Sequence, residues 1–264
     1  MAQNKYLNKL EGQSVLIIGG TSGLGFGVAE ACVEFKVANL YVSSSRQAKI
    51  EATISRLQNA YPDSKTKITG IACNLADEAT LESNIEKLFQ QINAKLDHIV
   101  FTAGDPLAIK PLESIDMAML KQAGMVRFFA PFFVAKHGRH YLHNNNGSSI
   151  TFTSGTIVQQ PNKDWTPVAG FMSGLVGLTR NLAHELKPIR VNLVEPGAVN
   201  TELWDPKFVG NPDARKAFLD KYGLSLATGV VGRVEDVVEL YLAVMKDRNN
   251  TGAVVESNGG ALVA

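Results

Sequence analysis

Short β-branched runs alternate with longer helical stretches along this chain, and this alternation constrains its fold more than any other feature. Each run is apolar and bounded by turn residues, which is typical of a strand that is buried on both faces. The predicted strands cover residues 14–20, 39–44, 66–73, 98–104, 148–155, 188–197 and 253–260. The clearest predicted helices cover residues 24–35, 50–60 and 78–93. This order predicts an α/β fold, with a doubly wound parallel sheet covered by helices on both faces.

The domain organisation follows from the absence of any linker, repeat or low-complexity block in the 264 residues. We therefore expect one domain over residues 1–264. The segment from Val199 to Thr228 is an exception, because it is rich in Pro, Asn, Gly and Asp and has weak periodicity. A long irregular segment in a compact domain usually has a function, so we predict a substrate lid at about 199–228.

The balance of charges gives no sign of a charged macromolecular partner. The formal net charge is +1, so we expect neither a nucleic-acid nor a membrane partner. Cys32 and Cys73 lie in apolar runs, which predicts buried thiols rather than a disulfide or a metal pair. The histidines show no metal-ligand spacing, so we expect no metal site. The polar start of the chain does not resemble a signal peptide, and we expect a cytoplasmic protein.

A glycine-rich stretch follows the first predicted strand and opens the first predicted helix. The stretch reads GGTSGLG, with glycines that permit a tight turn and a close approach of the backbone to a ligand. A helix N-terminus at this point would offer free N–H groups to a pyrophosphate. An ordinary turn is the alternative reading, but the strand–turn–helix context favours a dinucleotide site. Its expected contacts are Gly19, Thr21, Ser22, Gly23, Leu24 and Gly25.

The end of the second predicted strand indicates which dinucleotide is bound. An NAD enzyme has a carboxylate there for the ribose hydroxyls, whereas this chain has Ser43, Ser44, Ser45 and Arg46. Hydroxyls and an arginine would bind the 2′-phosphate of NADP(H). The alternative is that Arg46 simply begins a solvated helix. We therefore predict NADPH or NADP⁺ as the cofactor.

Six motifs together resemble the short-chain dehydrogenase/reductase family along almost the whole chain. They are GGTSGLG (19–25), CNLAD (73–77), TAG (102–104), SITFTSG (149–155), GLTRNLAHEL (177–186) and IRVNLVEPGAVNTEL (189–203). The resemblance implies a Rossmann-type fold with a seven-stranded parallel sheet, and a homo-oligomer that is a dimer or a tetramer. It also implies further cofactor contacts at Asn74, Leu75, Thr102, Ala103, Gly104, Pro196, Gly197, Val199 and Thr201.

The chain departs from this family at three of its four working positions. The family uses an Asn, a Ser, a Tyr and a Lys, and the alignment keeps only the serine, as Ser154. Arg127, Val168 and Met172 stand at the positions of the Asn, the Tyr and the Lys. Reduction of a ketone leaves an alkoxide that needs a proton, which valine and methionine cannot supply. Reduction of an iminium ion needs no proton, so the substitutions favour a C=N⁺ substrate.

Charged and aromatic residues near the missing tyrosine are candidates for new roles. Asp164 precedes Val168 by one helical turn and could stabilise an iminium cation or move a proton, although an Asp there is also typical of a helix cap or a turn. Arg127 lies in an apolar helix and should pair with an acid or a substrate oxygen, unless it faces the surface. Trp165 could stack on a flat aromatic substrate, or pack in the core. With Ser154, these residues are the catalytic candidates.

Other aromatic residues have less specific readings. Trp204 lies on the predicted lid and could also stack on a substrate, although core packing is an equally good reading. The phenylalanines beside Arg127 are expected in the core and in subunit contacts. They are Phe128, Phe129, Phe132 and Phe133.

A narrower resemblance rests on the arginine, the missing Tyr and Lys, and the Asp164–Trp165 pair. These features resemble fungal members of the family from the malbrancheamide and paraherquamide pathways. The resemblance implies NADPH-dependent reduction of a cyclic iminium in prenylated indole alkaloid biosynthesis, followed by a stereocontrolled intramolecular Diels–Alder reaction. The implied substrate is a hydrophobic, aromatic, cationic imine. Two alternatives stay open: a carbonyl reductase in which Ser154 with Asp164 or Arg127 replaces the acid, and an inactive NADP(H)-binding protein.

Overall fold

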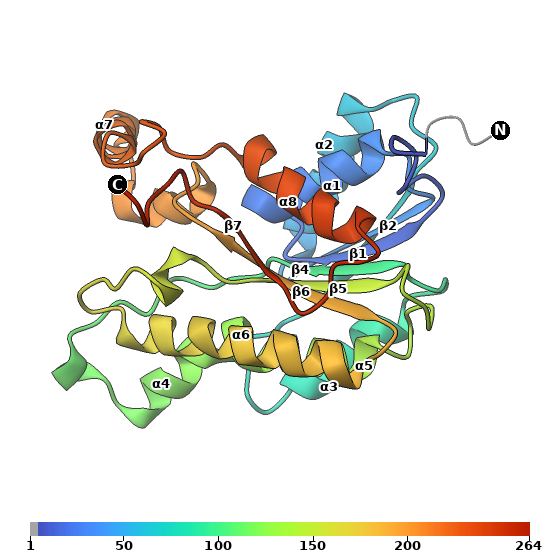
Figure 1. Cartoon of the computed structure of the whole chain (residues 1–264), viewed down its shortest axis with the longest axis horizontal. Helices are drawn as coiled ribbons and strands as arrows, with labels where there is room; N and C mark the ends of the chain where they lie inside the picture. The colour runs from blue at the N-terminus through green and yellow to red at the C-terminus, as the bar shows by residue number, and fades with distance from the viewer. Residues whose placement is uncertain (1–4) are drawn as a thin grey trace.

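A parallel sheet between two layers of helices forms the body of the computed structural model, which describes residues 5–264 (Figure 1). The sheet has seven strands in the order β3-β2-β1-β4-β5-β6-β7, and every neighbouring pair is parallel. The predicted doubly wound α/β fold is therefore confirmed. The first four residues of the expected domain 1–264 lie outside the described residues.

All seven predicted strands form, and most are shorter than the apolar runs that predicted them. The strands are β1 (Ser14–Ile18), β2 (Asn39–Ser44), β3 (Lys67–Ala72), β4 (His98–Phe101), β5 (Ser149–Thr153), β6 (Arg190–Pro196) and β7 (Val254–Ser257). The predicted runs extended past several of these ends because they included the glycines that follow. Those glycines begin the loops instead, since they lack side chains to pack in a sheet.

The helices divide between the two faces of the sheet, as the strand-to-helix order predicts (Figure 1). One face is covered by α1 (Gly23–Glu34), α2 (Gln47–Ala60) and α8 (Val234–Lys246). The other face is covered by α3 (Leu81–Gln90), α4 (Met117–Gly124), α5 (Ala130–Gly138) and α6 (Thr166–Glu185). Two cores result, because successive side chains of a strand point to opposite faces. In β1, Val15 and Ile17 join one core, and Leu16 and Ile18 join the other.

A π-helix, η2 (Met125–Phe129), interrupts the path from α4 to α5. Short 3₁₀ helices complete the connections, at η1 (Leu112–Ser114), η3 (Thr156–Val158) and η4 (Glu202–Phe208). The sequence predicted one continuous apolar helix around Arg127 and gave no sign of the π-helix. Such wide turns are rare and often lie at functional sites.

The predicted lid, residues 199–228, is more ordered than its composition suggested. It contains η4 and α7 (Pro212–Gly223), so the prediction of an irregular loop is wrong there. The Asn211 side chain accepts a hydrogen bond from the Ala214 N–H at 2.9 Å, and Pro212 occupies the first turn, so both favour helix initiation. We call residues 199–228 the lid segment below, and its role as a lid stays a prediction.

The carboxyl ends of all seven strands meet at one edge, because the sheet is entirely parallel. The glycine-rich turn 19–25 follows β1, and residues 102–104 follow β4. These two strands are neighbours at the point where the strand order reverses. Ligands of open α/β sheets bind at this reversal, outside the carboxyl ends. The fold therefore predicts where the site lies before any side chain is considered.

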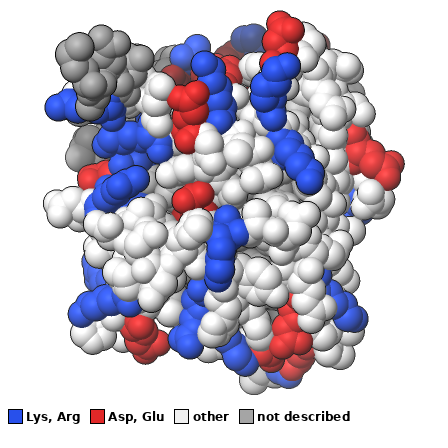
Figure 2. All heavy atoms as spheres, turned by 90° about the vertical axis from the view of Figure 1, so that its right-hand side faces the viewer, with Lys and Arg blue, Asp and Glu red and all other residues white. Residues whose placement is uncertain are grey.

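The prediction that both cysteines are buried thiols is confirmed. Cys32 and Cys73 are buried free thiols, and burial raises the pKa of the Cys32 thiol to about 12. Among residues 5–264, no helix is both long enough and apolar enough to cross a membrane. Figure 2 shows basic, acidic and uncharged side chains interspersed on the face at the right-hand side of Figure 1.

Candidate functional site

The glycine-rich turn brings the ends of β1, β2 and β4 into contact. Gly19 has a φ of +94°, and its N–H donates to the Ser43 carbonyl at 2.8 Å. A Cβ atom at Gly19 would lie 2.4 Å from the Ala103 nitrogen, and one at Gly25 would lie 2.2 Å from the Gly19 carbonyl oxygen. No side chain fits at either position, so these glycines are required by the close approach of the backbone segments.

The N-terminus of α1 is half-buried at this turn. Ser22 precedes the helix in an extended conformation, with φ −161°, and within residues 5–264 its side chain makes no capping hydrogen bond. The first N–H groups of the helix therefore lack an intrahelical acceptor and carry the positive end of the helix dipole. This arrangement fits a pyrophosphate, and it supports the predicted contacts at Thr21, Ser22, Gly23, Leu24 and Gly25.

The residues after β2 lie beside the same turn. Thr21 Oγ1 donates to Ser44 Oγ at 3.0 Å, so the glycine-rich turn and the β2 end are joined directly. Ser43 is fully buried and holds the turn through its carbonyl, whereas Ser45 and Arg46 are exposed at the start of α2. Ser44, Ser45 and Arg46 are thus better placed than Ser43 for a 2′-phosphate. Arg46 also begins a solvated helix, and the two readings are compatible.

The remaining predicted cofactor contacts follow β3, β4 and β6 at the same sheet edge. Asn74 is exposed after β3, and Leu75 beside it is buried. Thr102 N–H donates to the Ile18 carbonyl at 2.8 Å, which ties the end of β4 to β1. The loop after β4 continues with Ala103 and Gly104. Pro196 ends β6, and the loop after it continues with Gly197 and Val199. Thr201 reaches the turn itself, because its Cγ2 would lie 3.3 Å from a Cβ atom on Gly23.

An apolar wall occupies the place where the family has its tyrosine and lysine. Val168 and Met172 lie one turn apart on α6, with 1% and 7% of each residue exposed. They cluster with Ile157, which follows β5. Partly buried apolar side chains pack against these three, from Leu107, Ala108, Val158, Trp165 and Ala169. The wall contains no group that can donate a proton, and Trp165 belongs to it.

Ser154 is retained from the family but is already engaged. It is buried, and its hydroxyl donates to the Met172 carbonyl at 3.1 Å. In this position the hydroxyl ties the end of β5 to α6. A serine that donates to the main chain is a poor replacement for the missing phenol unless it rotates away.

Arg127 pairs with Asp105, a residue that the sequence analysis did not single out. The Arg127 Nε lies 3.2 Å from Asp105 Oδ1, as an ion pair without hydrogen-bond alignment, and Nη2 donates to the Asp105 carbonyl. Burial raises the pKa of the Asp105 carboxyl and lowers the pKa of Arg127, and their pairing opposes both shifts. The expectation that Arg127 pairs with an acid is confirmed.

The Arg127 guanidinium covers the loop that follows β4. Its Cζ, Nη1 and Nη2 atoms would lie 3.0 to 3.2 Å from a Cβ atom on Gly104. Since the adjacent Ala103 touches Gly19 of the glycine-rich turn, Arg127 lies one residue away from the cofactor side of the site. The π-helix η2 carries Arg127, and its wide turn helps to aim the side chain at this loop.

Asp164 does not cap helix α6. The helix begins at Thr166 after Trp165, and within the described chain no side chain caps it, so the cap reading is wrong. Asp164 has a φ of +66°, which is uncommon for a residue with a side chain and is tolerated best by Asn and Asp. Its carbonyl accepts from the Lys110 N–H at 3.0 Å, which joins the loop before α6 to the loop that carries Asp105.

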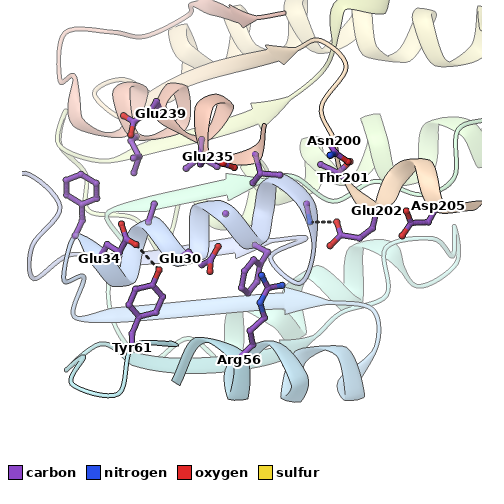
Figure 3. Close-up of a pocket in the computed structure, with 18 of the residues that line it drawn as sticks. Glu30, Glu34, Arg56, Tyr61, Asn200, Thr201, Glu202, Asp205, Glu235 and Glu239 are labelled. Carbon is purple, nitrogen blue, oxygen red and sulfur yellow. Dashed lines mark hydrogen bonds between the residues drawn. The ribbon is translucent and has the colours of Figure 1, made fainter. Parts of the chain in front are cut away.

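A pocket of about 670 Å³ lies between α1 and α8, and Gly23 of the glycine-rich turn is one of its lining residues (Figure 3). Acidic residues from α1, α8 and η4 line much of it, with Arg56 and Arg215 as the basic residues. Of the catalytic candidates Arg127, Ser154 and Asp164, all within the described residues, none lines this pocket. It is therefore distinct from the substrate side of the site.

The same pocket contains a contact that the sequence did not predict. The Glu202 carboxylate reaches from η4 to the start of α1 and accepts from the Gly23 N–H at 2.9 Å (Figure 3). Trp204, two residues later, donates from Nε1 to the Val199 carbonyl at 2.8 Å and packs on Phe218, so it belongs to the lid segment's own core.

A cluster of possible metal ligands lies away from this site. Glu82 and Glu86 of α3 face His137 of α5, and His137 Nε2 lies 3.0 Å from Glu82 Oε1. Lys136 Nζ lies 2.5 Å from the same oxygen, so an ammonium group already neutralises Glu82. We expect this cluster to join α3 to α5 rather than to bind a metal.

Tertiary contacts explain which site residues sequence reasoning missed. Asp105 directly follows the TAG motif, and an acid at that point could have been paired with Arg127. Glu202 follows Thr201 in the last family motif, but nothing in the local pattern indicates its contact with Gly23.

Comparisons with known proteins agree with this geometry. The model of the SDR-like Rossmann domain matches residues 6–264. The short-chain dehydrogenase/reductase fsr5 of Gibberella fujikuroi is 44% identical over 263 residues, which cover 98% of each chain. The solved structure of the MalC reductase/Diels-Alderase from Malbranchea aurantiaca has a TM-score of 0.91 at 37% identity, covering 98% of this chain and 99% of that one.

A further solved structure, a small-chain dehydrogenase in complex with NADPH, has a TM-score of 0.74 at 27% identity. It covers 96% of this chain and all of the other. The family model and the relatives span nearly the whole length of the sequence, and the observed strand order and glycine-rich turn fit them. This chain therefore belongs to the short-chain dehydrogenase/reductase family and is an oxidoreductase.

Proposed function

We propose that this chain is an NADPH-dependent reductase that delivers hydride to the carbon of a cyclic iminium ion. The observation that carries the proposal is the apolar wall at Val168 and Met172, where the family has its proton donor and its lysine. Both residues are buried among apolar neighbours, and neither side chain can donate a proton.

The residues of the glycine-rich turn support NADP(H) as the cofactor. The turn excludes side chains at Gly19 and Gly25 and lies at the N-terminus of α1, whose first N–H groups have no intrahelical acceptor, which fits a pyrophosphate. The end of β2 has no carboxylate to repel a 2′-phosphate and offers Arg46 at the surface. When bound, NADPH supplies a hydride, and the structural neighbour in complex with NADPH supports the same choice.

The substrate class follows from the proton balance. A carbonyl that accepts hydride becomes an alkoxide and needs a proton, whereas an iminium that accepts hydride becomes a neutral amine. The Ser154 hydroxyl donates to the Met172 carbonyl, so it is poorly placed as an acid. The geometry therefore favours the C=N⁺ substrate over the carbonyl reductase alternative.

The charged residues would hold and orient such a cation. Asp105 offsets the positive charge of Arg127, which would otherwise repel the substrate. Asp164 lies beside Trp165 in the loop joined to residue 110, and its carboxylate would stabilise the iminium charge. Trp165 would supply an aromatic surface for a flat indole. We assign binding and orientation to Arg127 and Trp165, and charge stabilisation to Asp164.

The likeness to MalC supports a second step after reduction. Its printed title describes a reductase/Diels-Alderase, and its fold matches almost the whole of this chain. We propose that the apolar wall also folds the reduced product for an intramolecular cycloaddition, within fungal prenylated indole alkaloid biosynthesis. The relative at 44% identity has no substrate in its name, so this part rests on MalC and on the site alone.

A substrate panel tests the proposal directly. The purified chain with NADPH would be given an N-methylated dihydro-β-carbolinium ion, which is permanently charged, and an aryl ketone and aldehyde of similar size. We expect NADPH oxidation with the iminium only. Rapid aldehyde turnover would favour the carbonyl reductase, and NADPH binding without any turnover would favour the inactive binding protein.

The cycloaddition has its own measurement. A prenylated iminium precursor would be reduced by the chain with NADPH, or chemically in its absence, and the cycloadducts would be separated on a chiral column. We expect one enantiomer from the enzyme and a racemate from the chemical reduction. A racemate in both cases would remove the second step from the proposal and leave the reduction intact.

A further inference from the structure

We propose that Glu202 occupies the phosphate-binding end of α1 when the cofactor is absent, so that NADP(H) must displace it and break its bond to the glycine-rich turn. Glu202 would then set the affinity for the cofactor and couple it to the lid. The inference rests on the cofactor of the proposed function, but not on its substrate.

The contact itself is specific. Glu202 Oε2 accepts from the backbone N–H of Gly23 at 2.9 Å, and Gly23 is the first residue of α1 (Figure 3). This N–H is one of the free donors at the positive end of the helix dipole. A carboxylate is stabilised there for the same reason that a phosphate is.

Two anions cannot share this donor. A pyrophosphate at the glycine-rich turn would meet the Glu202 carboxylate with like charge, and repulsion between the two would disfavour their joint binding. The lid segment also lies close to the turn, since Thr201 Cγ2 would be 3.3 Å from a Cβ atom on Gly23. Cofactor binding therefore requires Glu202 to release the Gly23 N–H.

Release of the Gly23 N–H by Glu202 would affect the rest of the lid segment, because internal contacts hold the residues on both sides of Glu202 in place. The Trp204 indole N–H donates to the Val199 carbonyl at 2.8 Å. Arg215 Nη2 donates to the Thr201 carbonyl at 2.9 Å, and Arg215 Nε lies 2.9 Å from Asp205 Oδ1 as an ion pair without hydrogen-bond alignment. These bonds tie η4 to α7 on both sides of Glu202.

Aromatic stacking completes this unit. The Phe218 ring of α7 lies 5.5 Å from Trp204, 5.2 Å from Phe208 and 6.2 Å from Tyr222. Because η4 and α7 are packed together in this way, Glu202 cannot move far from Gly23 unless the surrounding residues of the lid segment also shift. The Glu202–Gly23 bond joins this unit to the glycine-rich turn.

Binding measurements with a matched control test the role of Glu202. NADPH dissociation constants would be measured by calorimetry for the wild type, Glu202→Gln and Glu239→Gln. Glu239 lines the same pocket but lies on α8, so Glu239→Gln removes the same charge from the pocket without touching the lid segment. We expect Glu202→Gln to bind NADPH about threefold tighter and Glu239→Gln to match the wild type.

The outcomes separate this inference from the proposed function. An unchanged constant in Glu202→Gln, or equal tightening in both variants, would overturn the role of Glu202 and leave the cofactor assignment standing. No NADPH binding by any of the three proteins would overturn the cofactor, and the role of Glu202 with it.

Hydrogen exchange of the cofactor-free protein gives a second measurement that needs no ligand. In Glu202→Gln, we expect amides of residues 199–209 to exchange several-fold faster than in the wild type, while those of α8 stay unchanged. Equal exchange in the two cofactor-free proteins would refute the coupling to the lid.

Discussion

Three charged side chains set the net charge of the proposed substrate site, and one of them is positive and two are negative. Arg127 brings one positive charge next to the loop after β4, and Asp105 pairs with it. Asp164 brings a further negative charge to the neighbouring loop. One cation and two carboxylates would give the proposed site a net negative charge, which suits the cationic substrate proposed above. Loss of the family's lysine, replaced by Met172, removes a charge that would oppose this balance.

Asp164 gives the most direct prediction at the scale of a residue. We expect Asp164→Ala to lower kcat for the iminium at least tenfold, because a charge-stabilising group is lost. NADPH affinity should change less than about twofold, since Asp164 is not among the contacts expected for the cofactor. Steady-state kinetics and calorimetry measure the two quantities, and wild-type turnover in the variant would reduce Asp164 to a loop residue.

Asp105 gives a prediction about positioning, because it acts through Arg127. We expect Asp105→Asn to lower kcat about tenfold with little change in NADPH binding, since a guanidinium that is no longer held would misplace the substrate. Asp105→Glu keeps the charge and should recover part of the loss. If both variants behaved alike, or if only NADPH binding changed, the positioning role would be wrong.

Arg46 gives the prediction for cofactor choice. We expect the wild type to bind NADPH at least tenfold more tightly than NADH, because a guanidinium makes charge-assisted hydrogen bonds to a 2′-phosphate. Arg46→Ala should remove most of this preference without weakening NADH. Titration of both cofactors against both proteins measures it, and equal affinities in the wild type would overturn the reading of the β2 end.

Strand β4 shows how a buried titratable group serves an element of the fold. His98 at its start is fully buried, with Nδ1 2.8 Å from Ser149 Oγ and Nε2 2.9 Å from Gln13 Oε1. Burial, with a smaller contribution from Arg190 and Arg248, lowers the pKa of His98 to about 3. The ring is therefore neutral in the fold and links β4 to β5 and to the start of β1.

This burial predicts how stability depends on pH. Between pH 6.5 and about 3 the unfolded chain binds a proton on His98 and the folded chain does not, so stability falls as the pH falls. From pH 6.5 to 5 this group alone should remove about 2 kcal/mol from the free energy of unfolding. Urea unfolding of the wild type and His98→Gln at these pH values measures it. A variant with the same pH dependence as the wild type would exclude His98 as the cause.

The elements themselves were predictable to different degrees, for physical reasons. Strand β1 could be predicted because both of its faces are buried, which requires a continuous apolar run such as Val15–Ile18. Helix α7 could not be predicted, since its polar surface hides the helical periodicity of its apolar residues. Its aromatic residues pack within the lid segment rather than on the sheet. Just before the π-helix η2, Phe171 of α6 packs so closely on Gly124 that a Cβ atom there would lie 2.6 Å from the Phe171 Cζ, and no local sequence pattern indicates this contact.

Parts of the site could be predicted from the sequence only where a single motif contains their residues. The glycine-rich turn, the β2 end and the substitutions at Val168 and Met172 could all be read from the sequence, because family motifs fix their positions. Glu202 could not, because it meets Gly23 through the fold of distant segments, whereas Asp105 was missed although it directly follows the TAG motif. The absence of a helix cap at Asp164 and the packing of Trp204 within the lid segment likewise emerge only from the folded structure.

The assembly of whole molecules gives the last prediction. The family resemblance implies a dimer or a tetramer, and α5 carries an exposed apolar ring at Phe132, which is 46% exposed and packs on Phe133. A large aromatic side chain at the surface of a helix is well suited to a subunit contact. We therefore expect light scattering to give a mass of two or four times 28.5 kDa.

A charge at this ring tests the surface as well as the mass. Phe132→Glu should lower the mass at a given protein concentration, because a buried carboxylate without a partner strongly disfavours association. Leu112→Glu places the same charge on another exposed apolar residue, in η1, and should leave the mass unchanged. A monomeric wild type would refute the oligomer, and an equal loss in both variants would show that α5 is not the specific contact.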